Sequence, residues 1–251
     1  MEPFYVKNKE SQLYSVYYEP KVSANNGKGV VLCYPVGQEY IRCHRMYDNL
    51  ARKLARQGIH TVKFDYSGTG DSGGDFSSAR MAQWVSDIAG VAAELREGSD
   101  VQKLYVVGVR LGGLLALRYA EQAPVDGLVL LSPVVNGTGY LKEIQGDYNR
   151  WLSGSFARKG KTGKGEVECH GFLYSRELTG EINGIRPEAV RFPTAVPALI
   201  IDEDQSFADV KNIPFQPLVN KKLWQKKQGE EDKDVLPVRD IDAIVEWVSR
   251  N

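Results

Sequence analysis

The stretch YVVGVRLGGLLAL, residues 105–117, decides the fold. Its first half is rich in valine, as buried strands are, and its second half is rich in leucine and alanine, which favour a helix. Between the halves, Gly108, Arg110 and Gly112 form a G-x-R-x-G pentapeptide, in which a strand turns directly into a helix. A turn of this kind holds its central side chain, here Arg110, out of the sheet and above the N-terminus of the helix.

Outward from this stretch, strand-like and helix-like runs alternate along the chain. Buried-strand patterns cover residues 29–35, 60–66, 103–108, 126–133 and 196–202, and a weaker pattern lies near 219–225. Helical patterns cover residues 46–58, 79–98, 111–122 and 241–250. Strands separated by helices of this length indicate an α/β protein with a mostly parallel, twisted sheet and helices on both faces.

The alternation is interrupted between residues 134 and 193. We predict an insertion there, with one or two helices and a basic loop at 157–166, within a single domain that spans residues 1–251. By its position it should lie over the C-terminal ends of the strands, where such sheets bind ligands, and act as a lid. Most of its larger apolar residues are expected to pack on the body of the protein: Tyr140, Leu141, Ile144, Trp151, Leu152, Phe156, Phe172 and Leu173.

The composition argues against several classes of partner. Lysine plus arginine equals aspartate plus glutamate at 32 each, so no overall field attracts nucleic acid. No apolar run has the length of a membrane span, and the first residues lack the apolar core of a signal peptide, which favours the cytoplasm. The three cysteines have no metal-type spacing, so no metal is expected.

A glycine-rich loop, GTGDSGG at 68–74, superficially resembles a phosphate-binding loop. It lacks the lysine of such loops, so neither a nucleotide nor any other cofactor is expected. The favoured interpretation is a tight turn after the strand that ends near Asp65, with Asp71 bonding to the backbone to fix its shape.

Several motifs in order resemble the α/β-hydrolase superfamily, close to its serine-aminopeptidase-like branch: FDYSGTGDSGG (64–74), GVRLGG (108–113) and the C-terminal strand and helix. More narrowly, three stretches are similar to bacterial exosortase-associated hydrolase-like proteins: YPVGQEYIRCHRMYDNLARKLARQG (34–58), GVRLGGLLAL (108–117) and LLSPVVNGTGYL (130–141). The resemblance implies an α/β-hydrolase fold, with a serine nucleophile in the turn, an acid after a later strand and a histidine near the C-terminus.

The nucleophile and the histidine are missing from this chain. Arg110 takes the place of the serine, and a guanidinium, which stays protonated, cannot attack a carbonyl. None of the three histidines, His44, His60 and His170, lies near the C-terminus, where Trp224 stands instead. His60 opens a strand and is expected to be structural, whereas His44 is close enough to the first helix to reach the pocket.

The acid is ambiguous. Asp202 and Asp204 both follow the strand at 196–202, at the end where ligands bind. An acid near Arg110 would form a salt bridge with it rather than serve an absent base.

The resemblance also implies a set of oxyanion donors. In hydrolases of this kind they are backbone N–H groups, here from Leu111 and from the loop that holds Val36, Gly37 and Gln38. Donors at a helix N-terminus beside an arginine suit a carboxylate or phosphate. The predicted ligand-binding residues are therefore Arg110, Leu111, Val36, Gly37, Gln38, His44 and Trp224.

Two functions of different class remain. The favoured one is a degenerate hydrolase that binds a small anionic or acyl-bearing molecule, or a partner protein, without turning it over. The alternative is an active hydrolase or acyl transferase that acts on an ester, thioester or peptide through non-standard residues. Labelling with a fluorophosphonate separates the two, because the first predicts no covalent adduct.

Overall fold

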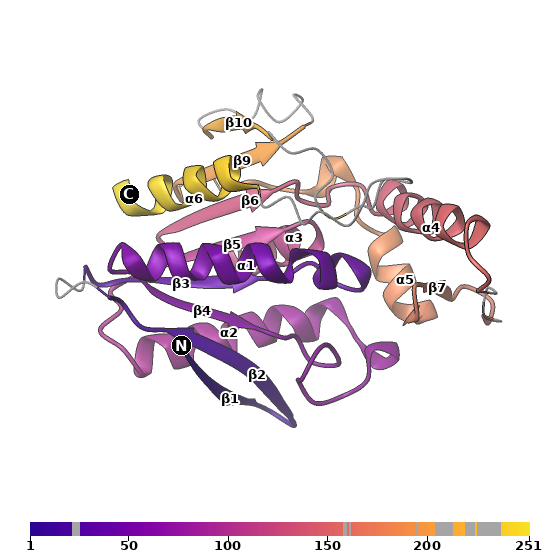
Figure 1. Ribbon diagram of the computed structural model, residues 1–251, viewed down its shortest axis with the longest axis horizontal. Helices are drawn as coiled ribbons and strands as arrows, with labels where there is room; N and C mark the ends of the chain where they lie inside the picture. The colour runs from indigo at the N-terminus through magenta and orange to yellow at the C-terminus, as the bar shows by residue number, and fades with distance from the viewer. Residues whose placement is uncertain are drawn as a thin grey trace.

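The computed structural model describes residues 1–21, 26–157, 160, 162–193, 195–203, 213–218, 224 and 237–251. Its centre is an eight-stranded sheet with the order β1-β2-β4-β3-β5-β6-β9-β10 (Figure 1). The strands are β1 (Glu2–Asn8), β2 (Ser11–Tyr18), β3 (Lys28–Cys33), β4 (His60–Phe64), β5 (Lys103–Val109), β6 (Gly127–Leu131), β9 (Ala198–Asp202) and β10 (Phe215–Pro217). The pairs β1–β2 and β2–β4 are antiparallel, and the other neighbours pair in parallel.

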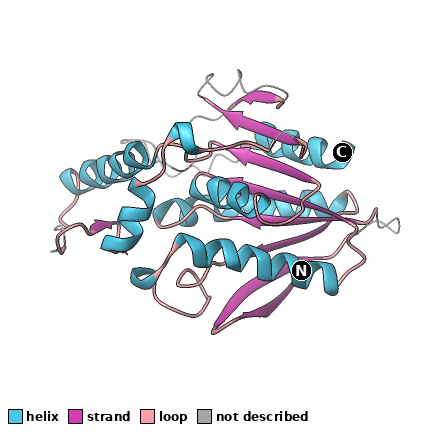
Figure 2. Ribbon diagram, turned by 180° about the vertical axis from the view of Figure 1, so that it is seen from behind, coloured by secondary structure: helices cyan, strands magenta, loops and turns pink. Residues whose placement is uncertain are grey.

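Helices cover both faces of this sheet. On one face lie α1 (Gln38–Arg56) and α6 (Val238–Arg250), which contact each other, and on the other lie α2 (Met81–Glu97) and α3 (Leu111–Ala120) (Figures 1 and 2). Every residue of β3, β4 and β6 is buried, as parallel strands between two helical layers require. The predicted fold class is confirmed.

Helix α1 begins at Gln38, well before residue 46, where the sequence pattern placed its start. Its buried face runs through Glu39, Cys43, Tyr47 and Leu50 at helical spacing. Because the first of these positions carries a charge, the apolar period is hidden in the first turns, and the sequence analysis began the helix too late.

The edge of the sheet holds a hairpin that the sequence analysis did not include. β1 and β2 pair along their whole length and join the sheet through β4. The weak strand expected near 219–225 lies outside the described residues except for Trp224. The last described strand, β10, precedes that stretch.

Between β6 and β9 the chain forms the segment that the sequence marked as an insertion. It contains α4 (Gly137–Ser153), the hairpin β7 (Val167–Cys169) and β8 (Phe172–Tyr174), α5 (Arg176–Asn183) and the 3₁₀ turn η2 (Pro187–Ala189). Figure 1 shows α4, α5 and β7 beside the edge at which the parallel strands end. Residues 158, 159 and 161 of the basic loop lie outside the described part.

The apolar residues of the insertion differ in burial. Tyr140, Leu141 and Ile144 of α4 are buried, Leu152, Phe172 and Leu173 are partly buried, and Trp151 and Phe156 are exposed. Most of these side chains are therefore at least partly withdrawn from solvent, as expected, and Trp151 and Phe156 are the exceptions.

A hydrogen bond from α5 connects the insertion to the body of the protein. The carboxylate of Glu181 in α5 accepts a hydrogen bond of 2.7 Å from the backbone N–H of Met81. Met81 opens α2, so the negative charge meets the positive end of a helix dipole.

The glycine-rich loop turns tightly after β4, but its geometry corrects the role expected for Asp71. The carboxylate of Asp65 accepts from the N–H of Asp71 at 3.0 Å, and the hydroxyl of Ser72 donates to the Asp65 carbonyl at 2.6 Å. Gly70 has a φ of 51°, and a Cβ there would lie 2.1 Å from Asp65 Oδ2. It is thus Asp65 that fixes the loop, and only glycine fits at position 70. The loop continues into the 3₁₀ turn η1 (Phe76–Ser78).

Candidate functional site

The turn between β5 and α3 holds Arg110 in an unusual backbone conformation. Its φ of 55° and ψ of −122° cost a residue other than glycine about 1–3 kcal/mol. The backbone N–H of Arg110 donates to the Leu131 carbonyl at 2.9 Å, and its own carbonyl accepts from Gly113, Leu114 and Val134. These bonds to α3 and to β6 and the residues after it keep the turn in place.

Two glycines make the turn possible. A Cβ on Gly108 would lie 2.4 Å from the carbonyl oxygen of Gly112, and a Cβ on Gly112 would lie 2.2 Å from the carbonyl oxygen of Tyr34. The start of α3 therefore lies very close to the end of β5 and to Tyr34, directly after β3.

Arg110 is buried, with only 9% of the residue exposed. Its Nε donates to Glu39 at 2.9 Å, and a terminal nitrogen donates to Glu143 at 2.5 Å. Glu39 belongs to the first turn of α1 and Glu143 to α4 of the insertion. The guanidinium thus joins the body of the fold to the insertion.

Two aromatic rings complete the surroundings of the guanidinium. Its carbon lies 5.4 Å from the ring centroid of Tyr140 and 4.7 Å from that of Trp224, within the range of cation–π attraction. The hydroxyl of Tyr140 also donates to Glu39 at 3.2 Å. Together Arg110, Glu39, Glu143, Tyr140 and Trp224 are called the Arg110 cluster below.

The cluster keeps its arginine charged. Burial alone would lower the pKa of Arg110, but Glu39 and Glu143 raise it above its ordinary value. Burial raises the pKa of Glu39, and the guanidinium opposes that rise. A cation locked between two carboxylates has no lone pair to attack a carbonyl, so the centre of the turn can bind and orient groups but cannot act as a nucleophile.

The residues expected to supply oxyanion donors lie next to this cluster. Leu111 opens α3 directly after Arg110, and Val36 is buried beside the start of α1. Gly37 is the N-cap of α1 with a φ of 62°, and Gln38 is its first residue. A Cβ on Gly37 would lie 2.3 Å from the hydroxyl of Tyr174, so β8 covers this loop closely.

His44 and His60 lie apart from the Arg110 cluster. His44 sits on α1 and lines a different pocket, together with Tyr40 and Asp65. His60 begins β4 at the opposite end of the strand from the turn, and its Nδ1 is 2.7 Å from the hydroxyl of Tyr17, which fits the structural role expected for it.

The acids and the tryptophan expected after β9 have different outcomes. Asp202 ends β9 and is buried, while Asp204 lies outside the described residues. Trp224 stands against Arg110, where chain order placed it in the absence of a histidine. The carboxylates that pair with Arg110 come instead from α1 and α4.

The sequence analysis missed Glu39, Glu143 and Tyr140. A charge at the head of an otherwise apolar helical stripe was a usable signal for Glu39. No local pattern marks Glu143 or Tyr140, because the face of α4 that meets Arg110 depends on how the insertion folds back.

Within the ranges that the structure describes, no group of three or more histidine, cysteine, aspartate or glutamate side chains is placed to hold a metal ion. Across the same ranges, no helix has both the length and the apolar character that crossing a bilayer requires.

Comparison with known families and proteins gives a consistent relationship. The family model described as Hydrolase_4, serine aminopeptidase, S33, matches residues 30–169. The mitochondrial palmitoyl-protein thioesterase ABHD10 of Rattus norvegicus is 31% identical over 70 residues, which are 28% of this chain and 22% of that protein. Esterase EstD of Thermotoga maritima is 24% identical over 140 residues, 53% of this chain and 33% of that protein. These matches span a third or less of the relatives' length.

Solved structures share the fold across the whole chain. The complex of DcsB with its substrate analogue has a TM-score of 0.70 at 16% identity, covering 100% of this chain and 98% of that one. Est1E of Butyrivibrio proteoclasticus with ferulic acid has a TM-score of 0.66 at 17% identity, covering 98% and 96%. Mouse α/β-hydrolase domain-containing protein 10 has a TM-score of 0.58 at 16% identity, covering 100% and 96%.

Proposed function

The chain belongs to the serine aminopeptidase S33 family of α/β hydrolases, and from that premise we propose that it is a degenerate member. In this proposal it binds a small anionic or acyl-bearing molecule at Arg110 and does not hydrolyse it. The observation that carries the proposal is the pairing of Arg110, at the centre of the turn, with both Glu39 and Glu143. A working member of the family needs a serine there.

The ligand would enter by replacing one of the two carboxylates. The side chain of Glu39 is 6% exposed and that of Glu143 is 31% exposed. Displacing Glu143 from Arg110 costs less free energy than displacing Glu39, because the Glu143 carboxylate is already partly solvated and can return to water. A ligand carboxylate can therefore take the place of Glu143, while Glu39 stays.

The chemical class of the ligand is suggested by the relatives. One curated relative is named a palmitoyl-protein thioesterase, and one solved neighbour holds ferulic acid. Both names contain an acyl group whose free form is a carboxylate. We therefore assign a carboxylate with an apolar tail as the ligand, with the insertion at 134–193 acting as the lid that carries Glu143.

Calorimetric titration of the full chain with decanoate, and with uncharged decanol as the comparison, tests the proposal. Decanoate is expected to bind and decanol to bind far more weakly. Glu143→Gln should bind decanoate several-fold more tightly, because a partly exposed ion pair worth up to about 1 kcal/mol no longer competes. Glu177→Gln in α5, which removes an exposed carboxylate, is the matched control and should change nothing.

A variant without the guanidinium should have the opposite effect on decanoate binding. Arg110→Met combined with Glu39→Gln removes both buried charges, so no charge is left unpaired in the core. Decanoate binding should be lost in this double variant. Equal binding of decanol and decanoate, or carboxylate binding that survives the double substitution, would contradict the proposal.

A partner protein is the second candidate. It is supported by Trp151 and Phe156, two large apolar side chains exposed on the insertion. Replacing both by serine should leave decanoate binding unchanged, so the two candidates are separable. The association with exosortase systems and the cytoplasmic compartment stay predictions.

A further inference from the structure

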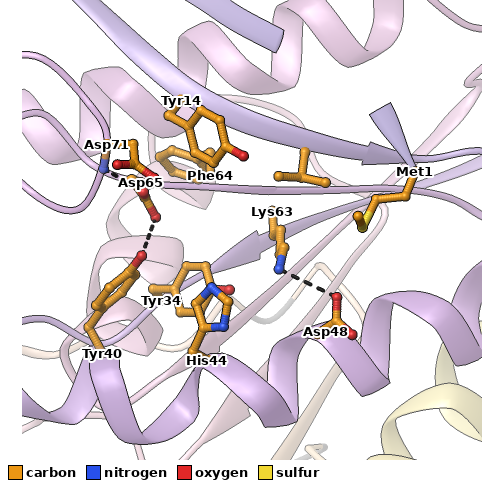
Figure 3. Close-up of a pocket in the computed structure, with 11 residues that line it drawn as sticks. Met1, Tyr14, Tyr34, Tyr40, His44, Asp48, Lys63, Phe64, Asp65 and Asp71 are labelled. Carbon is orange, nitrogen blue, oxygen red and sulfur yellow. Dashed lines mark hydrogen bonds and ion pairs between the residues drawn. The ribbon is translucent and has the colours of Figure 1, made fainter. Parts of the chain in front are cut away.

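A pocket lies away from the Arg110 cluster, between α1, β2, β4 and the glycine-rich loop. Its volume is about 260 Å³, and no member of the cluster lines it. Figure 3 shows side chains from these four elements converging on it. The residues that line it include Tyr14, Tyr34, Tyr40, His44, Asp65 and Asp71.

Asp65 supplies a buried carboxylate to this pocket. It accepts hydrogen bonds from the Tyr40 hydroxyl at 2.9 Å and from the Asp71 N–H at 3.0 Å (Figure 3). Both donors are neutral, so neither balances its negative charge. Burial raises the pKa of Asp65, as expected for a carboxylate taken out of water.

Tyr34 supplies a buried hydroxyl to this pocket. The residue is 1% exposed, and its hydroxyl has no hydrogen-bond partner among the described residues. Its ring is held by stacking on Tyr47 at 4.2 Å and by an edge contact with Tyr40 at 4.9 Å. Figure 3 shows this hydroxyl on the pocket side, beside the ring of His44. Buried hydroxyls are nearly always hydrogen-bonded, so this oxygen can accept a hydrogen bond from a group bound in the pocket.

The charges of the pocket favour a cation at one end. Lys63 is 3.6 Å from Asp48, and Asp48 is also bound by Arg52 at 2.8 Å, so this end of the pocket holds two cations and only one carboxylate. At the other end Asp65 and Asp71 lie together. Burial lowers the pKa of His44, which keeps its imidazole neutral at neutral pH.

We propose that this pocket binds the ammonium group of a small amine. The carboxylates of Asp65 and Asp71 and the hydroxyl of Tyr34 accept its three N–H bonds, and the rings of Tyr14 and Tyr40 pack on its carbon atoms. The inference rests on residues outside the Arg110 cluster. It therefore stands or falls independently of carboxylate binding at Arg110.

Titration calorimetry of the full chain with three probes tests the assignment. Ethylammonium is expected to bind and propionate is not. Alanine, whose carboxylate adds a group that the positive end of the pocket would favour, distinguishes a simple amine from an amino acid: tighter binding than ethylammonium identifies the amino acid as the source. Binding of propionate, or of no amine at millimolar concentration, would overturn the proposal.

Two substitutions locate the site without disturbing the fold. Tyr34→Phe removes only the unpartnered hydroxyl, and Asp71→Asn removes the charge of an exposed residue. Each should weaken ethylammonium binding, the first by about tenfold, as expected for a hydrogen bond to a charged group. Asp75→Asn, in the same loop but outside the pocket, is the control, because asparagine caps η1 as well as aspartate does. Affinity unchanged by both Tyr34→Phe and Asp71→Asn would contradict the assignment.

Discussion

At the residue scale, Arg110 stands at the centre of the strand-to-helix turn where the family resemblance implies a serine nucleophile. The turn is left-handed at a residue with a long side chain, and it is held by bonds to α3 and to the strand β6. The replacement of a serine by arginine needs acids nearby, since an unpaired guanidinium at this depth would be costly. Glu39 and Glu143 meet that need, and Tyr140 fixes the orientation of Glu39.

The Arg110–Glu39 pair gives a prediction about stability. Arg110→Met alone leaves Glu39 buried without its cation and should lower the free energy of unfolding by about 3–5 kcal/mol. Adding Glu39→Gln should restore most of that loss, because the buried charge is then absent. Urea unfolding of the two single variants and the double variant measures this. Additive losses in the double variant would show that the two side chains do not interact.

At this scale the sequence predicted part of the site. It placed Arg110 at the centre of a strained turn and Trp224 where a histidine is expected, because both follow from chain order. It did not identify the carboxylates that bind Arg110. Their approach is made by α1 and α4, which are far apart in sequence, and no local pattern encodes that contact.

At the scale of elements, the position of α4 depends on one ion pair and on buried side chains near its start. Glu143 binds Arg110, and Tyr140, Leu141 and Ile144 pack beneath the helix. Near the end of α4 Trp151 is exposed, whereas Tyr148 is buried. The helix contacts α5 and β7 of the insertion, so it can move with them without breaking the sheet.

This arrangement predicts a local change in dynamics. Glu143→Gln weakens the bond to Arg110 and should raise amide hydrogen exchange along α4 while leaving β3, β5 and β6 unchanged. Added decanoate should raise exchange along α4 of the wild-type chain in the same way, because it displaces the same carboxylate. Glu177→Gln serves as the control. If neither the substitution nor the ligand changed the rate of amide hydrogen exchange along α4, the proposal that the insertion is a lid would lose its support.

His60, at the start of β4, gives a prediction about pH. Burial lowers its pKa below 6.5, and its Nε2 is buried without a partner among the described residues. Between the lowered pKa of His60 in the folded state and its pKa of about 6.5 in the unfolded chain, the unfolded chain binds a proton more readily than the folded one. The contribution of His60 to the free energy of unfolding should be fully present above pH 6.5 and should be lost as the pH falls through the pKa of the folded state.

The comparison variant for this effect is His60→Gln, which cannot take up a proton. Its free energy of unfolding, measured by urea titration from neutral to mildly acid pH, should fall less steeply than that of the wild type. His44 and His170 are present in both proteins, so their contribution cancels. Equal slopes would show that His60 does not sense pH.

At the scale of the whole molecule, the fold was readable from the sequence because it is encoded locally. Strand-like and helix-like runs alternate in the order that the sheet requires, and the turn at Arg110 joins two of them. The hairpin β1–β2 and the first turns of α1 were missed, the latter because Glu39 interrupts the apolar pattern. The amine pocket could not be predicted at all, since Tyr34, His44 and Asp65 come from separate elements.

At this scale the protein has the architecture of an α/β hydrolase, and we propose that it binds its ligand without hydrolysing it. The central claim of this proposal is that no side chain acts as a covalent nucleophile. Intact-mass measurement after incubation with a fluorophosphonate tests this most directly, with an active serine esterase of the same fold treated in parallel as the control. The account predicts an unchanged mass for this protein and a complete shift for the control. A mass increase by one phosphonyl group, mapped to any serine of this chain, would contradict it.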